Sequence, residues 1–193
     1  MAFWAEARRP PGRPAQLSRE QIVEAASCAE NLDTLTMREL AKRLDVSHSA
    51  LYRWVKNRDE LFDLISDVLI DRLLPPGETP GLAWQPFLAR LAWHMHDQFL
   101  ALPGYATHLS RPHPHNAHST GRLHDAIVTA FRDSGVSADL AEQSYYIYVT
   151  SLISWLAHQE NPLRIEPKMP RFDLFLDTLL RGLPAREPGS PRP

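Results

Sequence analysis

The chain has 193 residues, of which 44% are hydrophobic and 23% are charged, a balance typical of folded, water-soluble proteins and not of disordered ones. Its single cysteine, Cys28, excludes an intrachain disulfide and fits a reducing compartment. The first residues lack the apolar core of a signal peptide. The longest uncharged stretch, 143–159, is interrupted by polar residues, whereas a membrane span needs about 20 mostly apolar ones. We therefore expect a cytoplasmic protein with no membrane partner.

The charges are distributed unevenly. The formal net charge is -2, but residues 1–58 hold ten Lys and Arg against seven Asp and Glu, and the remainder holds eleven against sixteen. The basic excess therefore lies in the first third of the chain, where a DNA-binding element would use it.

Residues 1–16 contain an Arg- and Pro-rich run, Arg8–Pro14. Proline at this density prevents a regular helix, so we predict a disordered basic arm over 1–16. The arm could reach DNA phosphates or the minor groove, or it could be a tail without a partner.

Helical signals begin at Leu17, and no alternating strand pattern follows, so the sequence predicts an all-α fold. A capping box formed by Ser18 and Gln21 starts a helix that we expect to end at Asn31. A second capping box starts another helix at Thr36.

A tight turn is expected at 45–46, after which Ser47 caps a short third helix, and Asn57 starts a fourth that ends at Leu73. Two short helices joined by such a turn form a helix-turn-helix, which places its second helix in the major groove of DNA. Ala41 supplies the small residue where the helices cross. The apolar anchors beneath them are Leu40, Leu44, Val46, Leu51 and Val55.

The segment 35–62 resembles the DNA-binding domain of the tetracycline-repressor (TetR) family, above all in the string Ala-Leu-Tyr-Arg-Trp-Val-Lys-Asn-Arg-Asp-Glu-Leu. The resemblance extends over roughly 17–73. It implies a three-helix DNA-binding domain at 17–74, with the helix-turn-helix at about 36–55. A helical ligand-binding and dimerisation domain would follow at 82–183.

The resemblance also implies DNA contacts at individual positions. Those expected at backbone phosphates are Thr36, Arg38, Lys56 and Arg58. Those expected at or near the groove are Ser47, His48, Ser49, Tyr52, Arg53 and Trp54, with His48 and Ser49 as the base readers. Tyr52 and Trp54 could instead pack against the domain, because each ring can pack with one edge and bond with the other.

Two positions depart from the family pattern. Glycine is usual at the end of the first helix and in the turn, and this chain has Asn31 and Asp45 there. Both places call for a left-handed backbone, which Asn and Asp tolerate best among the other residues. We therefore expect a left-handed backbone at both.

A Pro- and Gly-rich run at 75–81 is the clearest domain boundary. Beyond it we predict helices near 84–101, 104–110, 120–134, 137–159 and 170–183, a loop at 111–119, and a disordered tail at 184–193. The last two helices carry broad apolar faces, which could pack on the domain core or on a partner. In the family, two late helices pair with their mates, so we expect a homodimer on a two-fold DNA site.

The same helices would enclose a pocket for an unknown small-molecule effector, with no other cofactor expected. The candidate lining residues are Trp93, His96, Phe99, Tyr105, Tyr145, Tyr148 and Trp155. Pockets are mostly apolar with a few oriented polar groups, and this set qualifies. Each ring could equally belong to the core.

Several histidines raise a rival hypothesis, a metal-binding helical protein. They are His94, His96, His108, His113, His115, His118 and His124. None has recognisable ligand spacing, so we expect no metal site, and no nucleophile or phosphate-loop motif predicts an enzyme. A further alternative keeps the helix-turn-helix but binds a protein partner, or none, in place of a small molecule.

The sequence therefore favours a transcriptional regulator, most often a repressor, that a small molecule releases from a palindromic operator in double-stranded DNA.

Overall fold

A computed structural model of the chain describes residues 17–75, 83–112, 117–162 and 169–187, without the side chains of 117–119. The expected basic arm, nearly all of the Pro- and Gly-rich boundary, and the end of the tail lie outside these residues. Within them the chain forms nine α-helices and no strand, so the all-α prediction is confirmed. No helix in these ranges combines the length and apolar character needed to cross a membrane.

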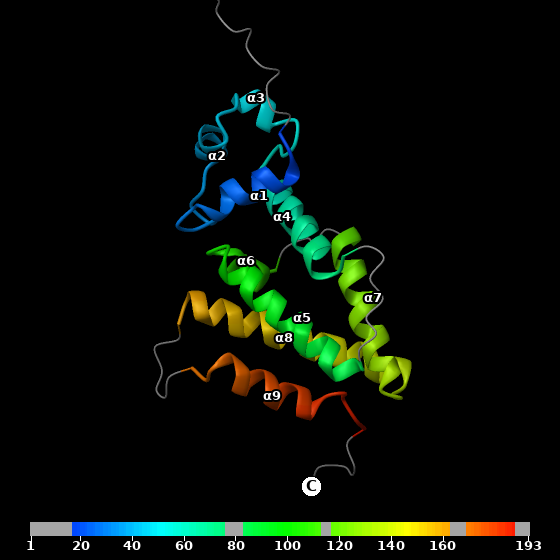
Figure 1. Cartoon of the computed structure of the whole chain (residues 1–193). Coiled ribbons are helices and arrows are strands. Elements are labelled where there is room, and N and C mark those ends of the chain that lie inside the picture. The colour runs from blue at the N-terminus through cyan, green and yellow to red at the C-terminus, as the bar shows by residue number, and fades with distance from the viewer. Residues whose placement is uncertain (1–16, 76–82, 113–116, 163–168, 188–193) are drawn as a thin grey trace, which may run out of the picture.

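The first four helices form the upper part of the molecule in Figure 1. They are α1 (Arg19–Ser27), α2 (Met37–Arg43), α3 (His48–Leu51) and α4 (Arg58–Leu73). The expected start signals all operate: Ser18 and Thr36 form complete capping boxes, and the side chains of Ser47 and Asn57 accept backbone N–H groups of α3 and α4. Each cap satisfies a backbone donor that the first helical turn would leave without a partner.

Asn31 does not behave as expected. The helix ends at Ser27, and Asp45 is the one non-glycine residue in the described ranges with a positive φ. The left-handed prediction for Asn31 was therefore wrong. Instead, the Asn31 side chain builds a turn, because its Oδ1 accepts the N–H of Asp33 at 2.6 Å and its carbonyl accepts the N–H of Thr34 at 3.2 Å. Side-chain bonding of this kind replaces the glycine-type helix end.

At Asp45 the left-handed prediction is confirmed, with φ of 51°. We expect Asp45→Gly to retain DNA binding and to leave the free energy of unfolding equal or raised by up to about 1 kcal/mol, because glycine adopts this backbone without a Cβ penalty. Thermal and denaturant melts of the two proteins measure the difference. A marked destabilisation would contradict this account of the turn.

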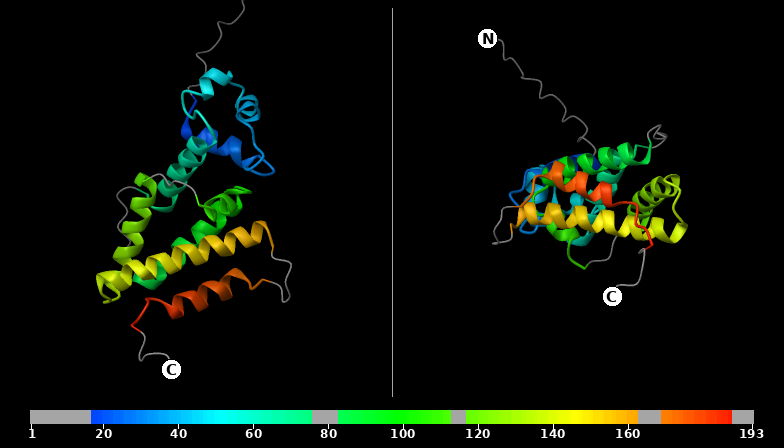
Figure 2. Two further views of the ribbon diagram at one scale, coloured as in Figure 1. Left: turned by 180° about the vertical axis from the view of Figure 1, so that it is seen from behind. Right: turned by 90° about the horizontal axis from the view of Figure 1, so that it is seen from below.

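The remaining helices form the lower part of the molecule: α5 (Trp84–Leu100), α6 (Tyr105–Leu109), α7 (Ala117–Asp133), α8 (Ala138–Glu160) and α9 (Phe172–Gly182). Helix α4 descends into this part, and α8 and α9 lie side by side at its base in both views (Figures 1 and 2). The predicted loop at 111–119 extends too far, because α7 already begins at Ala117. Residues 113–116 lie outside the described chain.

The predicted tail also begins too early. Pro184 is buried, and the N–H of Ala185 donates to Oγ of Ser144 at 2.8 Å. Ser144 is a fully buried polar residue of α8 whose hydroxyl also donates to the carbonyl of Leu140. A buried hydroxyl needs such partners, so the ordered chain continues past α9 to supply one.

Candidate DNA interface and ligand pocket

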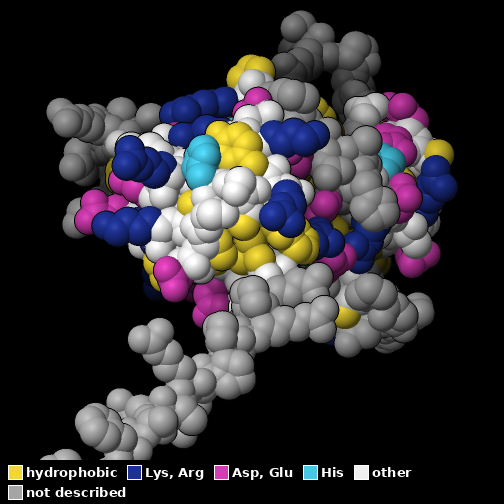
Figure 3. Space-filling model, turned by 90° about the horizontal axis from the view of Figure 1, so that it is seen from above, with side chains coloured by type: hydrophobic (Ala, Val, Ile, Leu, Met, Phe, Trp, Pro, Cys, Tyr) yellow, Lys and Arg dark blue, Asp and Glu magenta, His cyan; other side chains and the backbone are white. Residues whose placement is uncertain are grey.

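The short helix α3 presents an exposed face at one end of the molecule. Beneath it Leu51 and Val55 are completely buried, and Ala41 of α2 is nearly so. Nine of the ten predicted DNA-contact residues are exposed, namely Thr36, Arg38, Ser47, His48, Ser49, Tyr52, Arg53, Trp54 and Lys56. Seen from above, Lys and Arg side chains surround a patch of apolar and histidine surface (Figure 3). This arrangement suits duplex DNA, because the surrounding cations can contact the phosphates while the central side chains contact the uncharged base edges.

The aromatic residues of this face are half covered and half open. Tyr52 and Trp54 keep 40% and 39% of their surface exposed. The Tyr52 ring lies against His48, with centroids 4.3 Å apart, which holds both rings together at the surface. Each ring thus packs with one part and presents another, and their contact with DNA stays a prediction.

The start of α2 is fixed by its own capping box. The Thr36 hydroxyl donates to Oε2 of Glu39 at 2.8 Å, and Oγ1 accepts the Glu39 N–H at 3.2 Å. Hydrogen bonds from the Thr36 backbone and side chain keep the pKa of the Glu39 carboxyl below its usual value. Because the hydroxyl of Thr36 is engaged in this way, its first role is to cap the helix.

Arg58 points away from this face. Its Nη2 donates to the carbonyl of Leu32 at 2.6 Å and to Oδ1 of Asp33 at 3.0 Å, and its guanidinium lies 5.4 Å from the centre of the Phe62 ring. These contacts engage Nη2 of Arg58 within the protein, and a contact of Arg58 with a phosphate stays a prediction. Lys56 differs, with 78% of its side chain exposed.

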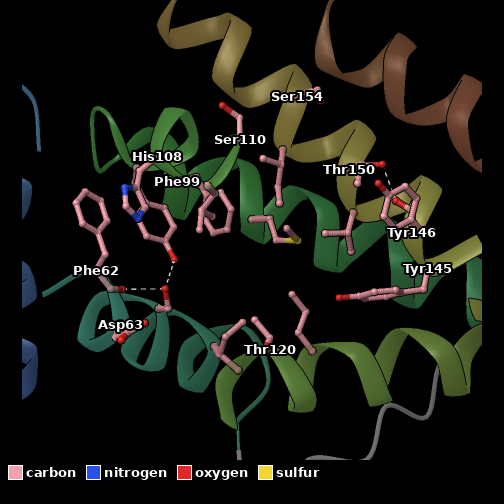
Figure 4. Close-up of a pocket in the computed structure, with 18 of the residues that line it drawn as sticks. Phe62, Asp63, Phe99, His108, Ser110, Thr120, Tyr145, Tyr146, Thr150 and Ser154 are labelled. Carbon is pink, nitrogen blue, oxygen red and sulfur yellow. Dashed lines mark hydrogen bonds between the residues drawn. The ribbon is translucent and has the colours of Figure 1, made fainter. Parts of the chain in front are cut away.

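A cavity of about 340 Å³ lies in the lower part of the molecule. It is bounded by side chains of α4, α5, α6, α7 and α8 (Figure 4). Three of the predicted pocket residues line it: Phe99, Tyr105 and Tyr145. Aromatic and aliphatic walls with scattered hydroxyls match the composition of small-molecule sites.

The other four predicted pocket residues are not among those that line this cavity; Tyr148 and Trp155 are buried, whereas Trp93 keeps 40% of its surface exposed. Trp93, His96 and Trp155 pack on Phe172 of α9, with ring centroids 4.4 to 4.9 Å from it. Tyr148 is completely buried and donates its hydroxyl to the carbonyl of Leu88 at 2.6 Å.

Sequence reasoning missed the contribution of α4, which it assigned to DNA binding alone. Asp59, Phe62, Asp63 and Ser66 of this helix line the cavity, as does His108 of α6. A signal for this existed, because Phe62, Ser66 and Ile70 follow one another at four-residue spacing and so share a helix face. A serine within such an apolar face indicates that its hydroxyl has a hydrogen-bond partner on a neighbouring element.

That contact joins α4 to α6. Oγ of Ser66 lies 2.8 Å from the Tyr105 hydroxyl, and the His108 ring stacks on Phe62 with centroids 3.6 Å apart and planes 8° from parallel. Burial raises the pKa of Tyr105 far above its usual value, so its hydroxyl stays protonated and able to donate. The contact between α4 and α6 thus forms one wall of the cavity.

The turn before α6 touches the DNA-binding part directly. The N–H of Leu32 donates to the carbonyl of Pro103 at 2.7 Å. At Gly104, where φ is +92°, an added Cβ would lie 2.3 Å from Oδ1 of Asn31. From the other side the Glu160 carboxylate accepts the N–H groups of Gly104 and Thr107 at 3.0 and 2.9 Å. One short helix therefore contacts both parts of the molecule.

Within the described ranges no three His, Cys, Asp or Glu side chains gather closely enough to hold a metal ion. His113 and His115 lie outside these ranges, and the side chain of His118 is not described.

No family model matches the chain. The HTH-type transcriptional repressor DrrR1 of Streptomyces coeruleorubidus is 38% identical over 83 residues, which are 41% of this chain and 29% of DrrR1. The chain therefore matches less than a third of this relative's length.

Solved structures match over far more of the chain. Apo ActR from Streptomyces coelicolor covers 89% of this chain and 96% of its own, with a TM-score of 0.68 and 24% identity. ActR in complex with actinorhodin covers 76% and 69%, with a TM-score of 0.61 and 28% identity. BioQ with its double-stranded DNA operator covers 89% and 100%, with a TM-score of 0.62 and 24% identity. In fold, and in the sequence of its first helices, the chain resembles the TetR family of transcriptional regulators.

Proposed function

We propose that this protein is a transcriptional repressor that binds operator DNA as a homodimer and is released by a small molecule bound in the cavity. The observation that carries the proposal is that α4 belongs both to the DNA-binding part and to the wall of the cavity. The start of this helix follows the exposed helix α3, and its middle forms a wall of the cavity through Phe62, Asp63 and Ser66.

The DNA-binding half of the proposal rests on the exposed face of α3 over a fully buried support. Helices of this kind enter the major groove by their exposed side chains. His48 and Ser49 are proposed to meet base edges, and Arg38 and Lys56 to meet phosphates. DrrR1 is a repressor by name, and BioQ has been solved with its operator; both support this half.

The ligand half rests on the cavity. A molecule that enters it meets the Phe62–His108 stack and the Ser66–Tyr105 hydrogen bond. Moving these contacts moves α4, whose first turn is joined to the end of the α3 segment by a bond from the Lys56 N–H to Oε2 of Glu60 at 2.8 Å. Release requires the ligand to bind more tightly to the conformation that does not fit DNA. A ligand with equal affinity for the two conformations would not change the equilibrium between them.

The homodimer is proposed to form through α8 and α9. Tyr146 and Ile147 of α8 and Leu174 of α9 keep 68%, 41% and 54% of their surface exposed. Phe172 and Leu176 face the protomer's own core instead, so only part of the apolar stripe of α9 is left for a partner. A symmetric pair of recognition helices would then match a palindromic site.

An interaction protein without a small ligand is the second candidate, and a closed, fully packed second domain would have favoured it. The cavity of about 340 Å³ favours the ligand-responsive regulator. A single water molecule needs a cavity of only about 10–15 Å³, so this one is far larger than a packing defect.

Selection of bound fragments from genomic DNA, at low ionic strength, tests the regulator function. We expect enrichment of duplexes that share a palindrome, with two protomers bound to each. Failure to enrich any duplex would contradict the proposal. Enrichment without two-fold symmetry would contradict the homodimer.

A further inference from the structure

Several hydroxyl groups line the cavity, and for four of them the structure fixes the direction of the hydrogen bond that they already make. The four belong to Ser66, Tyr105, Ser110 and Thr150. A hydroxyl has one hydrogen to donate and lone pairs with which to accept. The acceptor of that one hydrogen therefore decides what each group can offer to a ligand.

The hydroxyl pair at the contact between α4 and α6 is the best determined. Oγ of Ser66 lies 2.9 Å from the carbonyl oxygen of Phe62 and 2.8 Å from the Tyr105 hydroxyl. A carbonyl can only accept, so the single hydrogen of Ser66 points to Phe62. Tyr105 must then donate to Ser66, because Ser66 has no second hydrogen. The hydrogen bonds run from Tyr105 through Ser66 to the Phe62 carbonyl, along the dashed lines in Figure 4.

Two other hydroxyls of the lining have also donated their hydrogen to the backbone. Oγ of Ser110 donates to the carbonyl of Thr107 at 2.8 Å, and Oγ1 of Thr150 donates to the carbonyl of Tyr146 at 2.6 Å. Like the oxygen of Tyr105, each can accept a hydrogen bond from a ligand. None of them can donate one without breaking a hydrogen bond within the protein.

Tyr145 differs from these four groups. Its ring is half-buried, and its hydroxyl points into the cavity in Figure 4. In the part of the chain that the structure describes, no group forms a hydrogen bond with this hydroxyl. Burial, with a smaller contribution from Glu142, raises the pKa of Tyr145, so the hydroxyl stays protonated. Tyr145 therefore has a hydrogen to donate to a ligand.

We propose that the cavity selects molecules that carry a hydrogen-bond donor, an O–H or N–H group, at the end near Tyr105, and that the Tyr105 oxygen is the acceptor that sets this preference. A ligand carbonyl at this end would face another acceptor, and both would stay buried without a partner, which is costly. A carbonyl is received at Tyr145 instead. The inference rests on the proposed function of the cavity as the effector site.

The test uses three uncharged three-ring probes of nearly the same shape. Carbazole has an N–H donor, 9-fluorenone has a carbonyl acceptor at the equivalent position, and fluorene has neither. Binding of carbazole to the full-length protein is measured by fluorescence anisotropy without DNA, and the other two are measured by displacement of carbazole. We expect carbazole to bind about three- to tenfold more tightly than fluorene, which is the usual net gain from one hydrogen bond.

Substitutions of single tyrosines locate the two kinds of hydrogen bond. Tyr105→Phe should abolish the advantage of carbazole over fluorene and leave 9-fluorenone binding unchanged relative to fluorene. Tyr145→Phe should weaken 9-fluorenone relative to fluorene by about three- to tenfold and keep the advantage of carbazole. Tyr52→Phe makes the same change at the exposed end of α3 and should alter neither comparison.

Ser66→Ala tests the direction of the hydrogen bonds, because it should change what Tyr105 offers. Without Oγ of Ser66 the Tyr105 hydroxyl regains a hydrogen for a ligand. We therefore expect 9-fluorenone to gain about three- to tenfold in affinity relative to fluorene. If Ser66 had only a structural role, the substitution would change the affinities of the three probes alike. Circular dichroism confirms that each variant is folded, and Ser66→Ala decides the question if Tyr105→Phe does not fold.

Three results would overturn the inference: carbazole that binds no more tightly than fluorene or does not bind up to its solubility limit, an advantage of carbazole that survives Tyr105→Phe, or no gain of 9-fluorenone in Ser66→Ala. Binding of the duplexes selected from genomic DNA is measured separately. A protein that binds a duplex but shows no preference for the donor retains the regulator function and loses this ligand class. One that prefers the donor but ignores every duplex does the reverse.

Discussion

Replacing Leu51 with alanine is expected to lower the free energy of unfolding by about 3 kcal/mol, as typical for Leu→Ala in a closed core, and to abolish DNA binding. Leu51 is completely buried beneath α3, and this helix has only four residues. A helix this short is held by its packing and not by its own hydrogen bonds. Denaturant unfolding and anisotropy with a selected duplex measure the two effects.

Leu51→Met is the matched control. It conserves side-chain volume and should cost less than about 1.5 kcal/mol, with DNA binding retained. If Leu51→Ala kept full stability and full affinity, Leu51 would not be the anchor that holds α3 in place.

Gly104→Ala is expected to lower the free energy of unfolding by about 2–3 kcal/mol, the sum of a left-handed backbone and a displaced neighbour. Gly104 has φ of +92°, and its added Cβ would meet Oδ1 of Asn31 at 2.3 Å and the Leu32 nitrogen at 3.2 Å. The Asn31 side chain cannot move away freely because it accepts the N–H of Asp33. Since this contact joins the two parts of the molecule, the variant should also weaken the effect of ligand on DNA affinity.

Two other glycines separate the causes. Gly135 has the same φ of +92° with nothing near its Cβ position, so Gly135→Ala should cost only about 1 kcal/mol for the backbone. Gly121 lies in α7 with open space around it, and Gly121→Ala should stabilise by up to about 1 kcal/mol through helix propensity. Equal costs at positions 104 and 135 would show that the Asn31 contact contributes nothing.

The helix-turn-helix could be predicted from sequence because its signals are local. Ser18, Thr36, Ser47 and Asn57 each cap the helix that follows within a few residues, and such signals need no knowledge of the rest of the chain. The left-handed backbone at Asp45 was predictable for the same reason.

The position of Arg58 was not predictable, because it depends on a residue far away in sequence. An arginine at the start of α4 can reach outward to a phosphate or inward to the protein. Asp33 and the Leu32 carbonyl, which precede α2, determine that it points inward. The family resemblance predicts a phosphate contact for the residue at position 58, but it gives no information on the Asp33 carboxylate that Arg58 meets.

The pocket was predicted in part, and α5 shows why. Periodicity indicates which side chains face inward, but α5 packs between two layers. Met95 and Phe99 face the cavity, whereas Trp93 and His96 pack on Phe172 of α9. Aromatic residues that lie close together on one helix thus contact different neighbours, and only the tertiary arrangement separates them.

If the exposed face of α3 contacts DNA bases, a substitution at His48 is the most direct way to detect it. Duplex selection should be repeated with His48→Ala, which removes an exposed side chain and no buried one. We expect the base preference to relax at one pair of symmetry-related positions of the operator, with the preference at the other positions unchanged. Identical base preferences for the variant and the original protein, at equal affinity, would contradict it.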